Sequence, residues 1–177
     1  MNFETPKIIH RSDWGAVEPP SNKPYFLQIP TSIIIHHFGF PADKPNCRIS
    51  EHFKGAKTIR KLQKNAIKKN GLIDIEYHYI IAPDGTIYKG RPVTAVGKHC
   101  DGKCNMSSVG IMCYGNYNVE KVPDDVKISL VYLLRNLVDV FNINPENIFG
   151  HRDKDFTSCP GAYMYAFIER IKNRCQF

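Results

Sequence analysis

The sequence predicts a single α/β domain in which a mixed central β-sheet is flanked by helices. Short apolar segments rich in β-branched residues alternate along the chain with segments whose apolar residues recur at helical spacing. The 177 residues are 42% hydrophobic and 23% charged, which is typical of a compact domain with one core. We therefore expect one domain over residues 1–177, with a core from about 8 to 172.

The first expected elements are two extended segments and a helix. Lys7–His10 is a short extended stretch, and Ile33–Ile35 is a β-branched run typical of a buried central strand. From Ser50 to Ala66 apolar residues recur every three or four positions, which predicts a helix. Lysines repeat the same spacing one position later and place a basic stripe beside the apolar one: Lys54, Lys57, Lys61, Lys64 and Lys68.

A hairpin and a further strand are expected next. Tyr77–Ala82 and Thr86–Lys89 have the composition of strands and are separated by Pro83-Asp84-Gly85, a turn sequence. Ser108–Tyr114 is another apolar run of strand length. These segments extend the sheet that begins with the isoleucine run.

The last part of the chain predicts two helices around a short strand. Asp124 and Asp125 are expected to cap a strongly apolar helix that runs to about Phe141, because acidic residues suit the positive start of a helix. Ile148–Phe149 is a short strand that ends in Gly-His. Pro160-Gly161 opens a final helix with an apolar face.

Histidines and a cysteine lie at or near the ends of predicted strands, where open sheets usually carry their ligand-binding sites. His36 and His37 end the first buried strand, and only one of them can face a given cleft because strand side chains alternate. His151 ends a later strand, and Cys159 precedes the last helix. Catalytic zinc takes three such ligands, whereas structural zinc takes four. His36, His151 and Cys159 are therefore a candidate zinc cleft, and unrelated histidines with a buried thiol are the alternative that the residues alone leave open.

The cysteines allow two other interpretations. A cysteine before a helix can act as a nucleophile with a histidine base, so Cys159 also fits a cysteine peptidase. His99, Cys100 and Cys104 form a rival metal cluster, with Cys113 as a third sulfur. Cys100 and Cys104 also fit a local disulfide or two reduced thiols, and their spacing does not decide between these states.

The net charge of +7 comes from 24 Lys and Arg against 17 Asp and Glu and favours an anionic partner. No zinc-finger spacing or RNA-binding signature accompanies it, so nucleic acid is not expected. The stripe from Lys54 to Lys68 is either a solvated face or a surface that docks on an anionic polymer. Residues 1–7 lack the pattern of a signal peptide, and no apolar run reaches the roughly 18–20 residues that span a bilayer. We expect a protein made in the cytoplasm that does not insert into membranes.

The whole chain resembles a known family through motifs that occur in a fixed order: Arg11-Ser12-x-Trp14-Gly15, Ile33-Ile34-Ile35-His36-His37, Asp74-Ile75-x-Tyr77-His78-Tyr79, Asp84-Gly85-Thr86-Ile87-Tyr88, Val96-Gly97-x-His99, Asn105-Met106-x-Ser108-Val109-Gly110-Ile111, Gly115-Asn116-Tyr117, and Gly150-His151-Arg152-Asp153 through Thr157-x-Cys159-Pro160-Gly161. The chain is similar to the zinc N-acetylmuramoyl-L-alanine amidases of the second type. This family includes phage lysozymes of the amidase kind and the animal peptidoglycan recognition proteins.

By this resemblance, one zinc ion would be held by the three residues already singled out, His36, His151 and Cys159. His37 would line the cleft or brace its strand, and Tyr77 matches a tyrosine whose hydroxyl lies beside the metal. Thr157 stands where some relatives have lysine and can donate only a neutral hydrogen bond. Non-catalytic members typically lose the zinc cysteine, so the presence of Tyr77 and Cys159 implies an enzyme.

The implied reaction is hydrolysis of the amide between N-acetylmuramic acid and L-alanine in bacterial peptidoglycan, with Tyr77 and Thr157 stabilising the oxyanion. Further residues are predicted to contact sugar or peptide: Arg91, His99 and Asn105. The alternative is a peptidoglycan-binding receptor without activity. Many animal members carry paired cysteines after the histidine pair, whereas this chain has Cys47 alone, which favours a bacterial or phage origin. With no wall-binding repeat, we expect a lysin that reaches the cell wall after its release from the cytoplasm.

Overall fold

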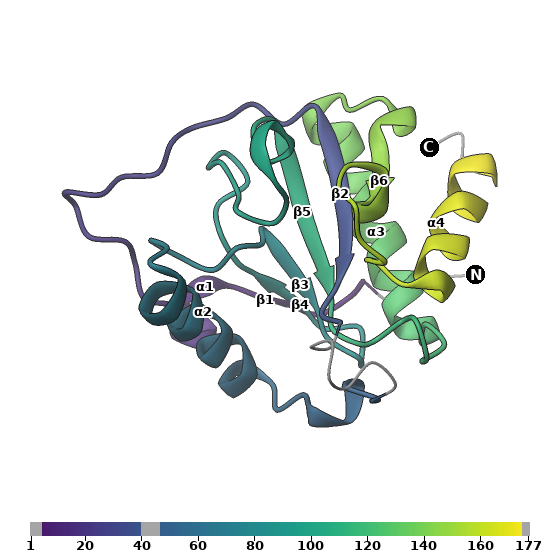
Figure 1. Ribbon diagram of the computed structural model, residues 1–177, viewed down its shortest axis with the longest axis horizontal. Coiled ribbons are helices and arrows are strands. Elements are labelled where there is room, and N and C mark those ends of the chain that lie inside the picture. The colour runs from purple at the N-terminus through teal and green to yellow at the C-terminus, as the bar shows by residue number, and fades with distance from the viewer. Residues whose placement is uncertain (1–4, 40–46, 175–177) are drawn as a thin grey trace.

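The computed structural model of the protein describes residues 5–39 and 47–174. A central sheet lies between two sets of helices (Figure 1). One face of the sheet packs against α1 and α2, and the other packs against α3 and α4. The bounds of these helices are α1 (Arg11–Trp14), α2 (Ala56–Asn70), α3 (Asp124–Phe141) and α4 (Ala162–Arg174). The predicted sheet flanked by helices is confirmed.

The sheet contains strands in the order β1-β4-β3-β5-β2-β6. Their bounds are β1 (Ile8–Ile9), β2 (Ser32–His37), β3 (Tyr79–Ile81), β4 (Ile87–Lys89), β5 (Ser108–Cys113) and β6 (Ile148–Gly150). β2 runs parallel to both β5 and β6, while β3 and β4 form the antiparallel hairpin that the turn sequence predicted. Because β2, β5 and β6 are parallel, their carboxyl ends meet at one edge of the sheet.

The two faces of β2 have different neighbours. Ile33 and Ile35 pack in a core that includes apolar residues of α3 and α4. Ile34 and His36 point to the opposite face because strand side chains alternate. The core on that face is built by α1, α2 and the β3–β4 hairpin, around buried residues such as Trp14 and Ile59. His36 is therefore directed to the α2 side of the sheet.

The helix predicted from Ser50 begins at Ala56 instead. Ser50–His52 forms a separate 3-10 turn, η1, and Phe53 after it is extended, with φ −70° and ψ 129°. Gly55 takes φ +56°, a left-handed value that stops the helix from extending toward the N-terminus. The predicted start was wrong because apolar spacing alone does not detect this break. The lysines of the basic stripe are exposed, and their docking on an anionic polymer stays a prediction.

α3 is the long core helix that the apolar pattern predicted. Asp124 and Asp125 occupy its first turn, but Pro123 is the N-cap residue. The acidic pair was therefore wrongly assigned as a cap, and it stabilises the helix start by its charge. Over the described residues, no helix combines the length and apolarity needed to cross a bilayer.

His78 connects the hairpin to β5 from a fully buried position. Its Nδ1 accepts a hydrogen bond from the Gly110 backbone N–H at 2.8 Å, and its Nε2 donates to the Ala95 carbonyl at 2.8 Å. These partners require a neutral ring with its proton on Nε2. Burial lowers the pKa of His78 to about 4.

We predict that His78 makes the free energy of unfolding depend on pH below its unfolded-state pKa of 6.5. The folded-state pKa is depressed, so this stabilisation is present above 6.5 and is lost as the pH falls toward 4. Between pH 7 and pH 4, the free energy of unfolding should fall by roughly 3 kcal/mol less in His78→Gln than in the wild-type protein. Urea unfolding at both pH values measures this difference. His52→Gln, at an exposed histidine, is the control. Equal pH dependence in H78Q and wild type would contradict the assignment.

Candidate metal centre

Three candidate metal ligands meet at the carboxyl end of the parallel strands. His36 lies near the end of β2, His151 follows β6 directly, and Cys159 precedes α4. One nitrogen of each imidazole and the Cys159 sulfur all lie within 4.8 Å of one another. The strand register explains this, because Ile35 pairs with Gly150 and the two histidines are the next residues on neighbouring parallel strands. The fold thus brings together the three residues that the sequence singled out.

His37 lies on the other side of the strand and is tied to the protein interior. The Tyr117 backbone N–H donates to its Nδ1 at 3.1 Å, and only 7% of the residue is exposed. The backbone N–H of His37 also points at the Cys159 sulfur, at 3.4 Å. These contacts agree with bracing the strand, one of the two roles expected for His37, while its contact with substrate stays a prediction.

Hydrogen bonds fix the orientation of both candidate-ligand imidazoles. The Nε2 of His36 lies 3.0 Å from Nδ1 of His99, and the Nε2 of His151 lies 2.6 Å from Oδ2 of Asp155. With a proton on each Nε2, both rings donate these bonds and keep the Nδ1 lone pair for a metal. The Nδ1 of His36 lies 3.8 Å from the Cys159 sulfur, which agrees with this orientation.

Burial sets the protonation states of these groups. Burial, and then the neighbouring His99 and His151, lower the pKa of His36 well below its usual value, so the ring is neutral, the form that binds metal. Burial raises the pKa of the Cys159 thiol to about 12, although the His37 backbone N–H and the Arg152 guanidinium act to lower it. Without a cation, the thiol therefore stays protonated near neutral pH.

The state of Cys159 argues against a cysteine peptidase. A nucleophilic cysteine needs a lowered pKa, and burial has the opposite effect here. A divalent cation, in contrast, deprotonates a coordinating thiol outright. The chemistry of this cluster therefore suits a metal better than a thiol nucleophile.

Tyr77 and Thr157 border the cluster. The ring of Tyr77 lies edge-on to that of His36, with centroids 5.3 Å apart. Burial raises the pKa of Tyr77, so its hydroxyl remains a hydrogen-bond donor at neutral pH. Thr157 is exposed, and its side-chain oxygen accepts a hydrogen bond from the Cys159 backbone N–H at 3.2 Å. Donation by either hydroxyl to a group bound at the cluster stays a prediction.

The other residues predicted to contact substrate are nearly buried: Arg91, His99 and Asn105. Arg91 donates to the carbonyl oxygens of Ile75 and Val96, at 3.0 and 2.8 Å. The side-chain oxygen of Asn105 accepts two backbone N–H bonds from the loop that begins at His99, at 2.7 and 3.1 Å. Each has structural partners, and contact with substrate stays a prediction.

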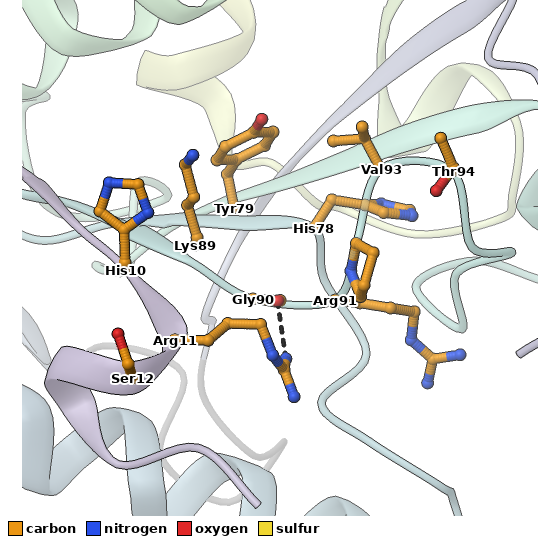
Figure 2. A pocket seen from close by; sticks show the side chains of 11 residues that line it. His10, Arg11, Ser12, His78, Tyr79, Lys89, Gly90, Arg91, Val93 and Thr94 are labelled. Carbon is orange, nitrogen blue, oxygen red and sulfur yellow. Dashed lines mark hydrogen bonds between the residues drawn. The ribbon is translucent and has the colours of Figure 1, made fainter. Parts of the chain in front are cut away.

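A separate cavity of about 470 Å³ lies beside α1 and the end of β4 (Figure 2). Arg11 and Arg91 belong to its wall, and Figure 2 shows the Arg11 guanidinium bonded to the Gly90 carbonyl, at 2.7 Å. Arg11 also pairs with buried Asp74 at 2.9 Å. Both guanidinium groups thus bond to groups of the protein itself. None of the three candidate metal ligands lines this cavity. The metal cluster remains the stronger candidate site.

The residues that hold His99 and His151 in place were not predicted from the sequence. A Cβ on Gly97 would come within 2.5 Å of the His99 ring, and one on Gly110 within 2.3 Å, so the ring needs both glycines. Both stand in the motifs that carry the family resemblance, which was an available signal. Asp155 follows His151 by four residues, and a carboxylate so close in sequence could have been proposed as its partner.

The structure distinguishes the three interpretations of Cys100 and Cys104: a disulfide, two thiols or a metal cluster. Cys100 and Cys104 are joined in a disulfide. Their sulfurs are bonded to each other, which excludes the rival metal cluster with His99. Cys113 is a free thiol inside the core on the α3 side, and Cys47 is a free, partly exposed thiol.

Comparison with known proteins identifies the family. The family model Amidase_2, described as N-acetylmuramoyl-L-alanine amidase, matches residues 26–162. The chain belongs to this amidase family.

Relatives of this amidase family carry two kinds of name. Peptidoglycan-recognition protein LB of Drosophila melanogaster is 33% identical over 168 residues, which are 93% of this chain and 68% of the relative. Its solved structure has a TM-score of 0.77, covering 93% of this chain and 94% of that one. The N-acetylmuramoyl-L-alanine amidase LysC of Clostridium intestinale is 32% identical, with a TM-score of 0.73 and coverage of 96% and 97%.

A ligand complex is also among the similar structures. A tyrosine-to-phenylalanine variant of the fly protein, in complex with tracheal cytotoxin, has a TM-score of 0.76 at 32% identity and covers 92% of each chain. Family membership therefore connects the chain to peptidoglycan. The choice between hydrolase and receptor depends on the chemistry of the site.

We predict that Gly110→Ala displaces the His99 ring, because the added methyl would meet three ring atoms within 2.7 Å. Stability should fall by about 1–3 kcal/mol, as in other overpacked sites. The affinity for zinc should fall as well, since His99 holds His36. Gly71→Ala is the control for zinc affinity: a Cβ there meets nothing within 4 Å, but the φ of +68° strains alanine, so this variant should lose stability and keep the wild-type affinity for zinc. A G110A variant with wild-type stability and wild-type zinc affinity would contradict this packing.

Proposed function

We propose that the protein is a zinc-dependent N-acetylmuramoyl-L-alanine amidase that hydrolyses the amide between N-acetylmuramic acid and L-alanine in bacterial peptidoglycan. The observation that carries this proposal is the complete ligand set of His36, His151 and Cys159, with both imidazoles oriented by a second partner. A protein that only binds peptidoglycan has no need of three converging ligands. The ligand set therefore favours the hydrolase over the receptor.

The donor set fits zinc. Zinc binds imidazole nitrogen and thiolate sulfur, whereas magnesium and calcium take oxygen ligands. Three protein ligands are the number used by catalytic zinc sites. His36 and His151 each offer a hydrogen bond from the far ring nitrogen, as metal-binding histidines do. The residues present are therefore those of a catalytic zinc site.

The chain's own residues supply positioning and charge stabilisation. When bound, zinc would polarise the scissile carbonyl and activate water for attack. Tyr77 and Thr157 would donate hydrogen bonds to the carbonyl oxygen as it gains negative charge. His99 and Asp155 act through the imidazoles, because they fix the tautomer that leaves Nδ1 free for the metal.

The substrate class follows from the relatives. A structure of the fly protein contains tracheal cytotoxin, which another similar structure describes as a monomeric diaminopimelic acid-type peptidoglycan. LysC is named for the amidase reaction itself. By similarity, the ligand of this chain would be a muropeptide of the bacterial cell wall.

Digestion of purified sacculi tests the proposed reaction. The protein loaded with zinc should release peptides with a free L-alanine amino terminus, detected by mass spectrometry. Removal of zinc with a chelator should stop the release, and added zinc should restore it. Cys159→Ser should reduce cleavage to background because it removes a zinc ligand, while Cys47→Ser, at a free cysteine of the same chain, should cleave normally.

Two outcomes of this digestion would contradict the amidase. Cut glycan strands or cut cross-bridges would indicate a different hydrolase. Sacculi that bind the wild-type protein tightly and release nothing, in the presence of zinc, would favour the receptor.

We predict that Tyr77→Phe separates catalysis from metal binding. Loss of one oxyanion donor lowers turnover by about 10²- to 10³-fold in other enzymes, and we expect the same range here. The affinity for zinc should stay at the wild-type value, because Tyr77 is not in the ligand set. Wild-type turnover in Y77F would contradict the role assigned to the hydroxyl.

A further inference from the structure

A short loop closed by a disulfide reaches both imidazoles of the candidate metal centre. The loop runs from His99 to Asn105, contains the 3-10 turn η2 (Gly102–Asn105), and is cross-linked by Cys100–Cys104. It lies directly before β5, which pairs with β2. Neither cysteine belongs to the ligand set, and the proposed reaction gives the disulfide no role.

The first connection runs from His36 into the loop through two side chains. The Nε2 of His36 lies 3.0 Å from Nδ1 of His99, the first residue of the loop. The Nε2 of His99 then lies 3.4 Å from the Ser108 hydroxyl, which donates to the carbonyl of Cys104. A single set of tautomers satisfies the whole series, with a proton on Nε2 of each ring. The last acceptor is a carbonyl of a disulfide-bonded residue.

The second connection runs from His151 to the same loop. Oδ2 of Asp155 accepts from the Nε2 of His151 at 2.6 Å and from the backbone N–H of Asp101 at 2.9 Å. Asp101 lies between the two cysteines, inside the cross-linked ring. The hydrogen bonds that start at each of the two imidazoles thus both lead to the backbone of this loop.

Hydrogen bonds and the disulfide together hold the loop in this conformation. Asp101, Gly102 and Lys103 at its crest are exposed to solvent. Asn105 fixes its start, because the side-chain oxygen accepts from two backbone N–H groups. The Cys104 backbone N–H also donates to the Asp101 carbonyl across the crest, at 3.2 Å, and the disulfide adds a covalent link between Cys100 and Cys104.

We propose that the disulfide-closed loop His99–Asn105 is a clamp that positions both metal-binding imidazoles and thereby raises the affinity for zinc. The proposal rests on the proposed function, because it requires His36 and His151 to bind the ion. An open loop would let the Asp101 N–H and the Cys104 carbonyl move. Each imidazole would then lose the partner that fixes its rotation. Loss of such outer partners elsewhere costs about 10- to 100-fold in metal affinity.

The test is the zinc affinity of the full chain, measured by competition with a chromophoric chelator. The double variant Cys100→Ser/Cys104→Ser should bind zinc roughly 10- to 100-fold more weakly than wild type. Circular dichroism before and after zinc addition should show that the variant is folded. The control is Cys47→Ser, which removes a thiol away from the clamp and should bind zinc normally.

A second variant keeps the disulfide and breaks the hydrogen-bond connection between His99 and the loop backbone. Ser108→Ala removes the hydroxyl between His99 and the Cys104 carbonyl and should weaken zinc binding by about 3- to 10-fold, the effect of one hydrogen bond. Ser129→Ala is the matched control, because Ser129 is also buried and donates to a backbone carbonyl, that of Gly85, from α3. It should leave zinc affinity unchanged.

The outcomes separate the clamp from the proposed function. Wild-type zinc affinity in a folded double cysteine variant would overturn the clamp, while sacculus cleavage by the wild-type protein would leave the amidase intact. A wild-type protein that binds no zinc would overturn both. If the double cysteine variant fails to fold, wild-type zinc affinity in S108A would overturn the clamp, because the orientation of His99 would then not depend on its link to the loop.

Discussion

The parallel pairing of β2 with β6 is the constraint on which the rest of the site depends. Ile35 and Gly150 are register partners, so the next residues, His36 and His151, leave neighbouring strands at the same edge of the sheet. The turn before α4 then brings Cys159 to that edge, where the His37 backbone N–H faces its sulfur. A slip of one residue in β2 would turn His36 into the α3 core and remove a candidate ligand from the site.

The face of the sheet matters as much as its register. Ile33 and Ile35 complete the core under α3 and α4, which directs His36 to the opposite face. On that face Gly110 leaves the space that the His99 ring fills, and His99 in turn holds His36. Packing and the candidate site are therefore coupled, because the glycine that admits His99 also determines how a candidate metal ligand is oriented.

The sequence predicted the parts of this structure that depend on local patterns. The hairpin across Pro83–Gly85, the apolar α3 helix and the alternation of His36 and His37 follow from turn chemistry and side-chain period. The start of α2 was wrong because the left-handed Gly55 interrupts a spacing that otherwise continues. Such a break depends on backbone conformation, which apolar periodicity does not report.

The order of motifs was enough to predict the candidate ligand set. The hydrogen bonds that support these residues could not be predicted from the sequence. The bond from His36 to His99 joins residues 63 positions apart, and no local pattern encodes such a pair. The state of Cys100 and Cys104 was open for a similar reason, because a four-residue spacing fits a disulfide, two thiols or a metal site. Only the conformation of the loop decides among them, and that conformation depends on contacts with Asp155 and Ser108.

The most direct test of the account is X-ray absorption at the zinc edge of the purified protein. We predict one zinc ion per chain with two nitrogen neighbours at about 2.0–2.1 Å and one sulfur neighbour at about 2.3 Å. A first shell without sulfur would remove Cys159 from the site. A shell of several sulfur atoms would show that zinc binds elsewhere in the chain and would contradict the assignment of His36, His151 and Cys159 as its ligands.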